Sequence, residues 1–258
     1  MKNLPLLVIA MSLVIAGCSK EHEKDSEEVA KDITIVSGQG DINPKINEFR
    51  QILGVTINTT PGVTGGHREV NWDALPVEVL GKALPLDFFN TVGANVPASR
   101  QRGLVYGVEG GGEFRVSASN FADVNSVAAP QFAAFSGERT FANISSNLWT
   151  GAFRVAGQPT IATVKGFGLV FSDVDKDNST FIEFFNGNEN LGKFFVPPHN
   201  NQSSFSFLGV YFSNKRVTNF RVGHEGRLVD GGKDISDGGT SDLIIMDDLF
   251  YDEPVAKD

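Results

Sequence analysis

The chain has 258 residues, of which 41% are apolar, with a formal net charge of −9 and one cysteine. An acidic surface repels phosphate backbones and anionic lipid surfaces, so the composition argues against nucleic acid as a partner. A single cysteine cannot form an internal disulfide, so stability must come from a packed core, which this apolar content can supply.

The first seventeen residues have the pattern of an export signal. Lys2 supplies a short positive start, residues 4–16 are an apolar run, and the small pair Ala16-Gly17 precedes Cys18. The run is short for a membrane span, and small residues before a cleavage point are typical of exported proteins. The position of Cys18 resembles the lipobox of bacterial lipoproteins, although an ordinary signal peptide that contains a cysteine is the alternative. We therefore expect acylation of Cys18 and a lipid anchor in the bacterial cell envelope, at the outer membrane or cell surface.

The next segment is predicted to connect this anchor to a folded domain. Residues 19–32 are highly charged and have no apolar period, so we expect residues 18–40 to be a flexible acidic tether. Within it, only residues 33–36 favour an edge strand. The remaining chain, 41–258, shows no second boundary and no internal repeat, which predicts a single domain.

One helix is predicted, near the start of this domain. Asn43 can cap its N-terminus, Pro44 suits its first turn, and Gly54 can end it. One face of this helix is apolar, at Ile46, Phe49 and Leu53.

The rest of the domain has the pattern of β-structure. Turn signals recur every eight to twelve residues between short apolar runs, which is typical of a sandwich. Short strands are predicted at 84–92, 103–108, 113–119 and 149–155, and six clearer ones at 163–171, 181–185, 192–196, 204–212, 217–222 and 243–251. A long loop, 223–242, precedes the last strand. The predicted fold is all-β, a jelly-roll-like β-sandwich with one short N-terminal helix.

A polar loop at 58–76 is a candidate ligand site. It places Trp72 beside Arg68 and Asn71, so the indole could stack on a sugar while the polar groups bind hydroxyls. The alternative is a structural role, with Arg68 paired to Asp73 and Trp72 buried. Two carboxylates for glycoside cleavage need not be close in the sequence; Glu69 and Asp73 are the best candidate pair, and they are weak candidates because acidic residues are common.

Five segments of the chain resemble a family of exported bacterial proteins. They are GGHREVNWDALP, LPLDFFN, VKGFGLVFSDVD, SFLGVYF and LIIMDDLFYDEP, and the family carries GRREINWDGVP-like, GFGxVFxDVD-like and MDDFxYGEP-like motifs. The similarity spans residues 46–254 in matching order, but His67 stands where the family has its first arginine and Asp252 replaces a glycine. Many members end in a C-terminal sorting anchor, which the lipid at Cys18 could replace. The resemblance implies export and a similar fold, but it does not point to an activity.

Two groups of acidic residues are candidate metal sites. Asp173, Asp175 and Asp177 alternate where a strand turns, and three carboxylates in a tight turn suit calcium, which takes six to eight oxygen ligands. The spacing begins like an EF-hand loop, but Asn178 stands at the glycine position and Phe184 at the last ligand position, so that motif is excluded. The alternative is that these residues are solvent-facing turn formers.

Asp247 and Asp248 form the second group, at the end of the apolar run 243–246. A buried carboxylate needs a partner, which predicts either a metal or an arginine beside them. The candidate arginines are Arg154, Arg216 and Arg221. The arrangement looks like that of β-sandwich carbohydrate-binding modules, in which acidic residues near the last strand hold a structural calcium.

Signals for an enzyme are thin, because the chain has none of the common nucleophile, zinc or phosphate-loop motifs. The first hypothesis is therefore an envelope-anchored, non-catalytic β-sandwich that binds a ligand, most plausibly a glycan, with structural calcium. The second is a secreted glycan-active hydrolase or lyase that uses loop carboxylates. The third is a purely structural surface protein.

Overall fold

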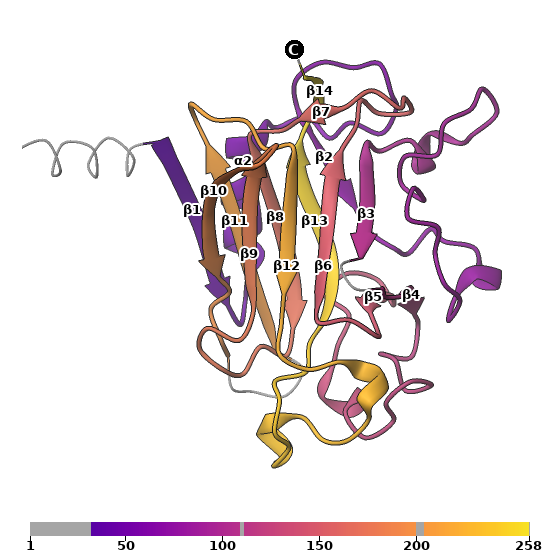
Figure 1. The fold of residues 1–258 in the computed structure, drawn as a ribbon, viewed down its shortest axis with the longest axis vertical. Helices are drawn as coiled ribbons and strands as arrows, with labels where there is room; N and C mark the ends of the chain where they lie inside the picture. The colour runs from indigo at the N-terminus through magenta and orange to yellow at the C-terminus, as the bar shows by residue number, and fades with distance from the viewer. Residues whose placement is uncertain (1–31, 109–110, 200–203, 258) are drawn as a thin grey trace, which may run out of the picture.

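Two antiparallel β-sheets are stacked face to face in the computed structural model, which describes residues 32–108, 111–199 and 204–257 (Figure 1). The predicted signal segment, Cys18 and most of the predicted tether lie outside these residues. The all-β prediction is confirmed. Within the described part of the chain, no helix is long and apolar enough to cross a membrane.

The larger sheet has seven strands, and both predicted acidic groups lie at its central strands. The group that begins with Asp173 directly follows one central strand, and Asp247 and Asp248 lie within the next. β13 lies near its middle and pairs with β8, β5 and β2, and its pairing shifts register between Met246 and Leu249. In spatial order the strands are β1 (Ile33–Gln39), β11 (Phe205–Phe212), β8 (Gly166–Ser172), β13 (Ile245–Asp252), β5 (Thr140–Asn143) and β4 (Phe114–Ser117), with β2 (His67–Val70) added beside β13.

The smaller sheet lies in front of the larger one in Figure 1. Its five strands are, in spatial order, β10 (Glu189–Phe195), β9 (Phe181–Asn186), β12 (Asn219–Gly223), β6 (Leu148–Phe153) and β3 (Leu104–Val108), and a separate ribbon joins β7 (Ala162–Thr163) to β14 (Val255–Ala256). From β8 onward the chain crosses repeatedly between the sheets, as in a jelly roll. Aromatic side chains fill the space between them, for example Phe167 stacked on Phe220 with ring centroids 3.9 Å apart.

The helix α2 (Asn43–Leu53) covers the outer face of the larger sheet. Its apolar face is buried as predicted, and Phe49 packs between strands β8 and β11. Gly168 and Gly209 allow this approach, because a Cβ at either position would lie 2.8 Å from a ring atom of Phe49. Asn43 is not the cap that the sequence predicts, because the helix begins at Asn43 and its N-cap position is Ile42, while Asp41 Oδ1 accepts the Asn43 backbone amide.

The loops in the described part of the chain contain five short 3₁₀ helices, and some of these loops cover another part of that outer face. Phe121, Phe132 and Leu228 pack from these loops onto Ile245 of β13. The 3₁₀ helices are η1 (Val77–Val79), η2 (Ala98–Arg100), η3 (Ala129–Gln131), η4 (Leu228–Asp230) and η5 (Ile235–Asp237). The last two divide the predicted long loop 223–242.

The structure corrects a predicted boundary and a predicted strand, and it adds a strand that was not predicted. Residues 33–39 form the edge strand β1, paired with β11 along its length, so they belong to the sandwich and not to the tether. Residues 84–92 were predicted as a strand but make successive turns, because Pro85 and Asp87 each accept an amide three residues on. β5 was not predicted.

Candidate functional site

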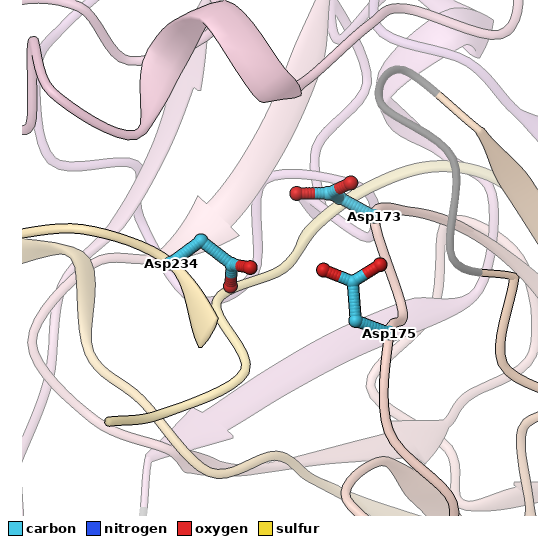
Figure 2. Close-up of side chains that lie close together, drawn as sticks. All are labelled: Asp173, Asp175 and Asp234. Carbon is cyan, nitrogen blue, oxygen red and sulfur yellow. The ribbon is translucent and has the colours of Figure 1, made fainter. Parts of the chain in front are cut away.

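Three aspartates from two separate segments converge beside the end of β8. The carboxylates of Asp173, Asp175 and Asp234 face a common space (Figure 2), and one oxygen from each lies within 4.8 Å of those from both others. Asp173 and Asp175 follow β8 directly, whereas Asp234 comes from the loop between β12 and β13. Two of the three were predicted from the sequence as metal ligands.

Asp173 is the centre of this acidic site. Its backbone adopts a left-handed conformation with φ of 70°, which is uncommon for a residue with a side chain. Asp173 comes directly after the last residue of β8, and its carboxylate is shielded from water. The side chain is completely buried, and neither of its oxygens has a hydrogen-bond partner among the described residues. A buried carboxylate in this state is costly unless a cation accompanies it.

The other two carboxylates are held in place by local hydrogen bonds. Asp234 caps η5 by accepting the backbone amide of Ser236, and its second oxygen accepts the amide of Leu243 at 2.6 Å. Asp175 is half-buried, and its Oδ2 has no partner within the described segments. The site therefore combines a fixed ligand, Asp234, with oxygens that are left unsatisfied.

Asp242 connects the turn after β8 to the loop that carries Asp234. It is buried, and its carboxylate accepts the backbone amides of Asp175 and Lys176 as well as the hydroxyl of Ser179 at 2.5 Å. These bonds fix the turn that follows β8 against the loop 223–242. Asp242 thus places the ligand-bearing residues without being one of the three that converge.

The electrostatics of the site favour a cation. Burial, together with the charges of Asp175, Asp234 and Asp242, raises the pKa of Asp173 to about 8. Burial, then a hydrogen bond with Asp234, raises the pKa of Asp175 to about 7, and burial raises that of Asp242 to about 6 despite its hydrogen bonds. A bound divalent ion reverses this effect, because it stabilises the ionised carboxylates.

The donor set fits a hard cation. Every converging group is a carboxylate, and neither a histidine nor a sulfur ligand joins them in the described part of the chain. Oxygen donors of this kind suit Ca²⁺, which completes six to eight ligands with backbone carbonyls and water, better than Zn²⁺. Asp173, Asp175 and Asp234 are the residues that would hold it.

The remaining predicted metal residues lie elsewhere. Asp177 is exposed at the tip of the same turn and does not join the cluster. Asp247 and Asp248 are buried within β13, at its register shift, and no third acidic group converges on them among the described residues.

Among the described residues, none of the three arginines that were predicted as alternatives to a metal pairs with Asp247 or Asp248. Asp247 Oδ2 instead accepts the backbone amides of Phe135 and Ser136, at 2.6 and 3.2 Å, and Asp248 accepts the Ser136 hydroxyl. The three candidate arginines have other partners: Arg154 donates to the Phe153 carbonyl, Arg216 lies 4.0 Å from Asp252, and Arg221 pairs with Glu183.

The predicted sugar-binding residues are mostly inaccessible. Trp72 is 1% exposed and stacks on Phe141 with centroids 4.2 Å apart, so it cannot stack on a ligand. Arg68 is fully buried and pairs with Glu253 at 2.7 Å, and not with Asp73 as the structural alternative proposed. Asn71 is exposed at the mouth of a cavity.

The weak catalytic pair is also engaged in structural contacts. Both oxygens of Glu69 accept hydrogen bonds from Arg50, at 2.7 and 2.9 Å, and His67 lies 2.8 Å from one of them. Burial opposes ionisation of Glu69, but these hydrogen bonds outweigh it and lower the pKa to about 2. Asp73 Oδ1 accepts the Glu138 amide. An ion-paired Glu69 does not suit a proton donor.

No protein-family model matches the chain, and neither a curated protein nor a solved structure shows detectable similarity to it. The interpretation of the acidic site therefore depends on its own geometry.

Sequence reasoning missed Asp234 and Asp242. They lie 61 and 69 residues beyond Asp173 along the chain, in a loop rich in glycine and aspartate. The one available signal is that loop itself, because loops of this length in a compact domain are usually functional or attached by side chains.

Proposed function

We propose that the protein is a non-catalytic, calcium-binding β-sandwich anchored in the bacterial cell envelope. The observation that carries this proposal is the fully buried Asp173 carboxylate, which has no partner among the described residues and faces two further carboxylates. A cation there would compensate a charge that the protein otherwise leaves unpaired.

The role of the cation in this proposal is structural. It would join the turn after β8 to the loop 223–242, because Asp173 and Asp175 come from the first segment and Asp234 from the second. Extracellular calcium modules bind with dissociation constants of about 10⁻⁴–10⁻³ M, so a site of this kind is filled outside the cell and is sensitive to chelators.

Export and anchoring remain part of the proposal. The signal pattern at 1–17 and the single cysteine at position 18 support acylation of Cys18, and stable anchoring takes two or more acyl chains. Mass spectrometry of the N-terminal peptide from membranes tests it, and Cys18→Ser should release the protein from the membrane.

A glycan is the ligand class that we propose for the domain. Its support is the cavity beside Asn71, which combines aromatic rings with hydrogen-bonding groups in the region where the polar loop 58–76 was predicted to bind sugar. Glu69 is ion-paired with Arg50, and Asp73 accepts a backbone amide. These contacts favour a structural role for the two residues over the hydrolase alternative.

Thermal melting of the purified protein with calcium or with EDTA tests the calcium site. At a calcium concentration 100 times the dissociation constant, the stabilisation is about 2.7 kcal/mol, or roughly 5–10 °C for a domain of this size. Asp173→Asn should abolish this shift. Asp177→Asn removes the same charge from the same turn but at an exposed position, so it should keep the shift. An unchanged response in Asp173→Asn would refute the proposal.

A further inference from the structure

A second candidate site is a cavity of about 190 Å³ that none of the residues of the acidic site lines. Its floor is formed by Phe88 and Phe89, which belong to the segment 84–92 that was predicted as a strand. Its walls come from the loop after β2 and from the 3₁₀ helix η2, which carries Arg100. Drug-sized sites occupy about 300–1,000 Å³, so this cavity suits one ring or a short chain.

The charges that line this cavity are unbalanced. Three ionisable side chains face it, Glu69, Arg100 and Arg102, which gives one negative and two positive charges. The negative charge is already neutralised, because Glu69 accepts two hydrogen bonds from Arg50. The cavity is therefore cationic in a protein whose net charge is −9.

Neither arginine has a carboxylate partner within the described residues. Arg102 donates to the Asn58 carbonyl at 3.0 Å, and Arg100 donates to the Thr91 hydroxyl at 3.0 Å. The guanidinium of Arg100 lies over the Phe88 ring, 4.3 Å from its centroid. Burial lowers the pKa of Arg102, and the neighbouring charge of Arg68 lowers it further. A half-buried guanidinium beside another cation gains most from an added anion.

We propose that this cavity binds a small organic carboxylate whose body has an apolar face. The carboxylate would pair with Arg102 and Arg100, and the body would lie against the phenylalanine floor, with Asn71 and Ser99 available to hydroxyls at the rim. Two sources have this chemistry, a uronic acid of a polysaccharide and a free aromatic acid. The first of these rests on the proposed glycan function and gives it a substrate class, an acidic sugar.

Calorimetric titration of the calcium-loaded protein distinguishes these ligands. The probes are methyl glucuronide and its neutral counterpart methyl glucoside, and phenylacetate with its neutral counterpart 2-phenylethanol. At least one carboxylate should bind about ten-fold more tightly than its neutral counterpart. Tighter binding of the glucuronide assigns a polysaccharide source, and tighter binding of phenylacetate assigns a free acid.

Charge-removing variants complete the test. Arg102→Met and Arg100→Met should each weaken carboxylate binding about ten-fold, whereas Lys215→Met, which removes an exposed positive charge beside β10, should leave it unchanged. The calcium-dependent melting shift of each variant shows that it is folded and tests the acidic site separately. The proposal is overturned if neither carboxylate binds better than its neutral counterpart, or if both arginine variants bind like the unmodified protein.

Discussion

The two groups of aspartates lie at neighbouring strands of the same sheet, one directly after β8 and the other within β13, and they differ in how many of their oxygens have no hydrogen-bond partner. At the acidic site, Asp173 has no hydrogen-bond partner among the described residues, and two further carboxylates face it. In β13, Asp247 Oδ2 accepts two backbone amides while its Oδ1 has no hydrogen-bond partner among the described residues, and Asp248 accepts a hydroxyl. A candidate cation site is thus marked by unsatisfied oxygens that converge, and the number of acidic residues in a motif is a poorer guide.

The pKa values of the buried aspartates are raised in both groups, but by different neighbouring charges. Burial and the adjacent Asp248 raise the pKa of Asp247 to about 9, so this pair can share one proton at neutral pH. The pKa of Asp173, about 8, is raised by burial and by several carboxylates contributed by both segments. A divalent ion can replace the protons there.

The largest expected effect is that Asp173→Asn shifts the melting temperature in opposite directions with and without calcium. In calcium, this variant should melt roughly 5–10 °C below the unmodified protein, because it lacks the ion. In EDTA at pH 8, it should melt above the unmodified protein, because the substitution removes a buried, unpaired charge. Differential scanning calorimetry in both buffers measures this, and a variant that is less stable in both would contradict the account. Asp247→Asn is the matched control and should keep its full calcium response.

The second expected effect concerns pH and calcium together. Carboxyl groups with a raised folded pKa bind more protons when folded, so without metal their contribution to stability is present at low pH and is lost as pH rises from about 4 to 8. Calcium binding displaces these protons, so its affinity should rise about tenfold per pH unit for each proton displaced between pH 6 and 7. Titrations at several pH values check this, and a constant affinity would place the ion elsewhere.

A smaller effect is expected from Asp247→Asn. The unmodified protein should lose about 2 kcal/mol, or roughly 4–8 °C, between pH 7 and 9, because the folded Asp247 has to release a buried proton there. The asparagine can accept the same two amides and does not titrate, so melting of this variant should depend less on pH. Equal pH profiles for both proteins would show that Asp247 does not hold the proton.

The smallest effect is expected at the exposed end of the turn. Asp177→Asn should change the calcium midpoint less than two-fold and the melting temperature by less than about 1 °C, because surface substitutions usually alter stability by under 0.5 kcal/mol. A large loss of affinity would return Asp177 to the ligand set that the sequence predicts.

Local patterns predicted most of the fold. Strands β8 to β13 follow from apolar runs between turn signals, and α2 follows from its apolar face and from Gly54. The segment 84–92 misled because its buried phenylalanines also fit a strand, whereas Pro85 directs a turn. Strand β5 has little pattern of its own and pairs through tertiary contacts.

The candidate site was predictable only in part. Asp173 and Asp175 lie together in the sequence, but Asp234 joins them through a loop whose path depends on the folded sandwich. Trp72 was open to two interpretations, and its burial against Phe141 depends on contacts far apart in the chain. The cationic cavity had no local signal, because its arginines and its phenylalanine floor come from different turns.

The most direct measurement is a crystal structure of the protein grown with calcium, with anomalous scattering used to locate the ion. The account predicts one calcium among Asp173, Asp175 and Asp234, at about 2.3–2.6 Å from their oxygens, with none beside Asp247. An ion bound to Asp247 and Asp248, or a side chain or water in place of the ion beside Asp173, would contradict it.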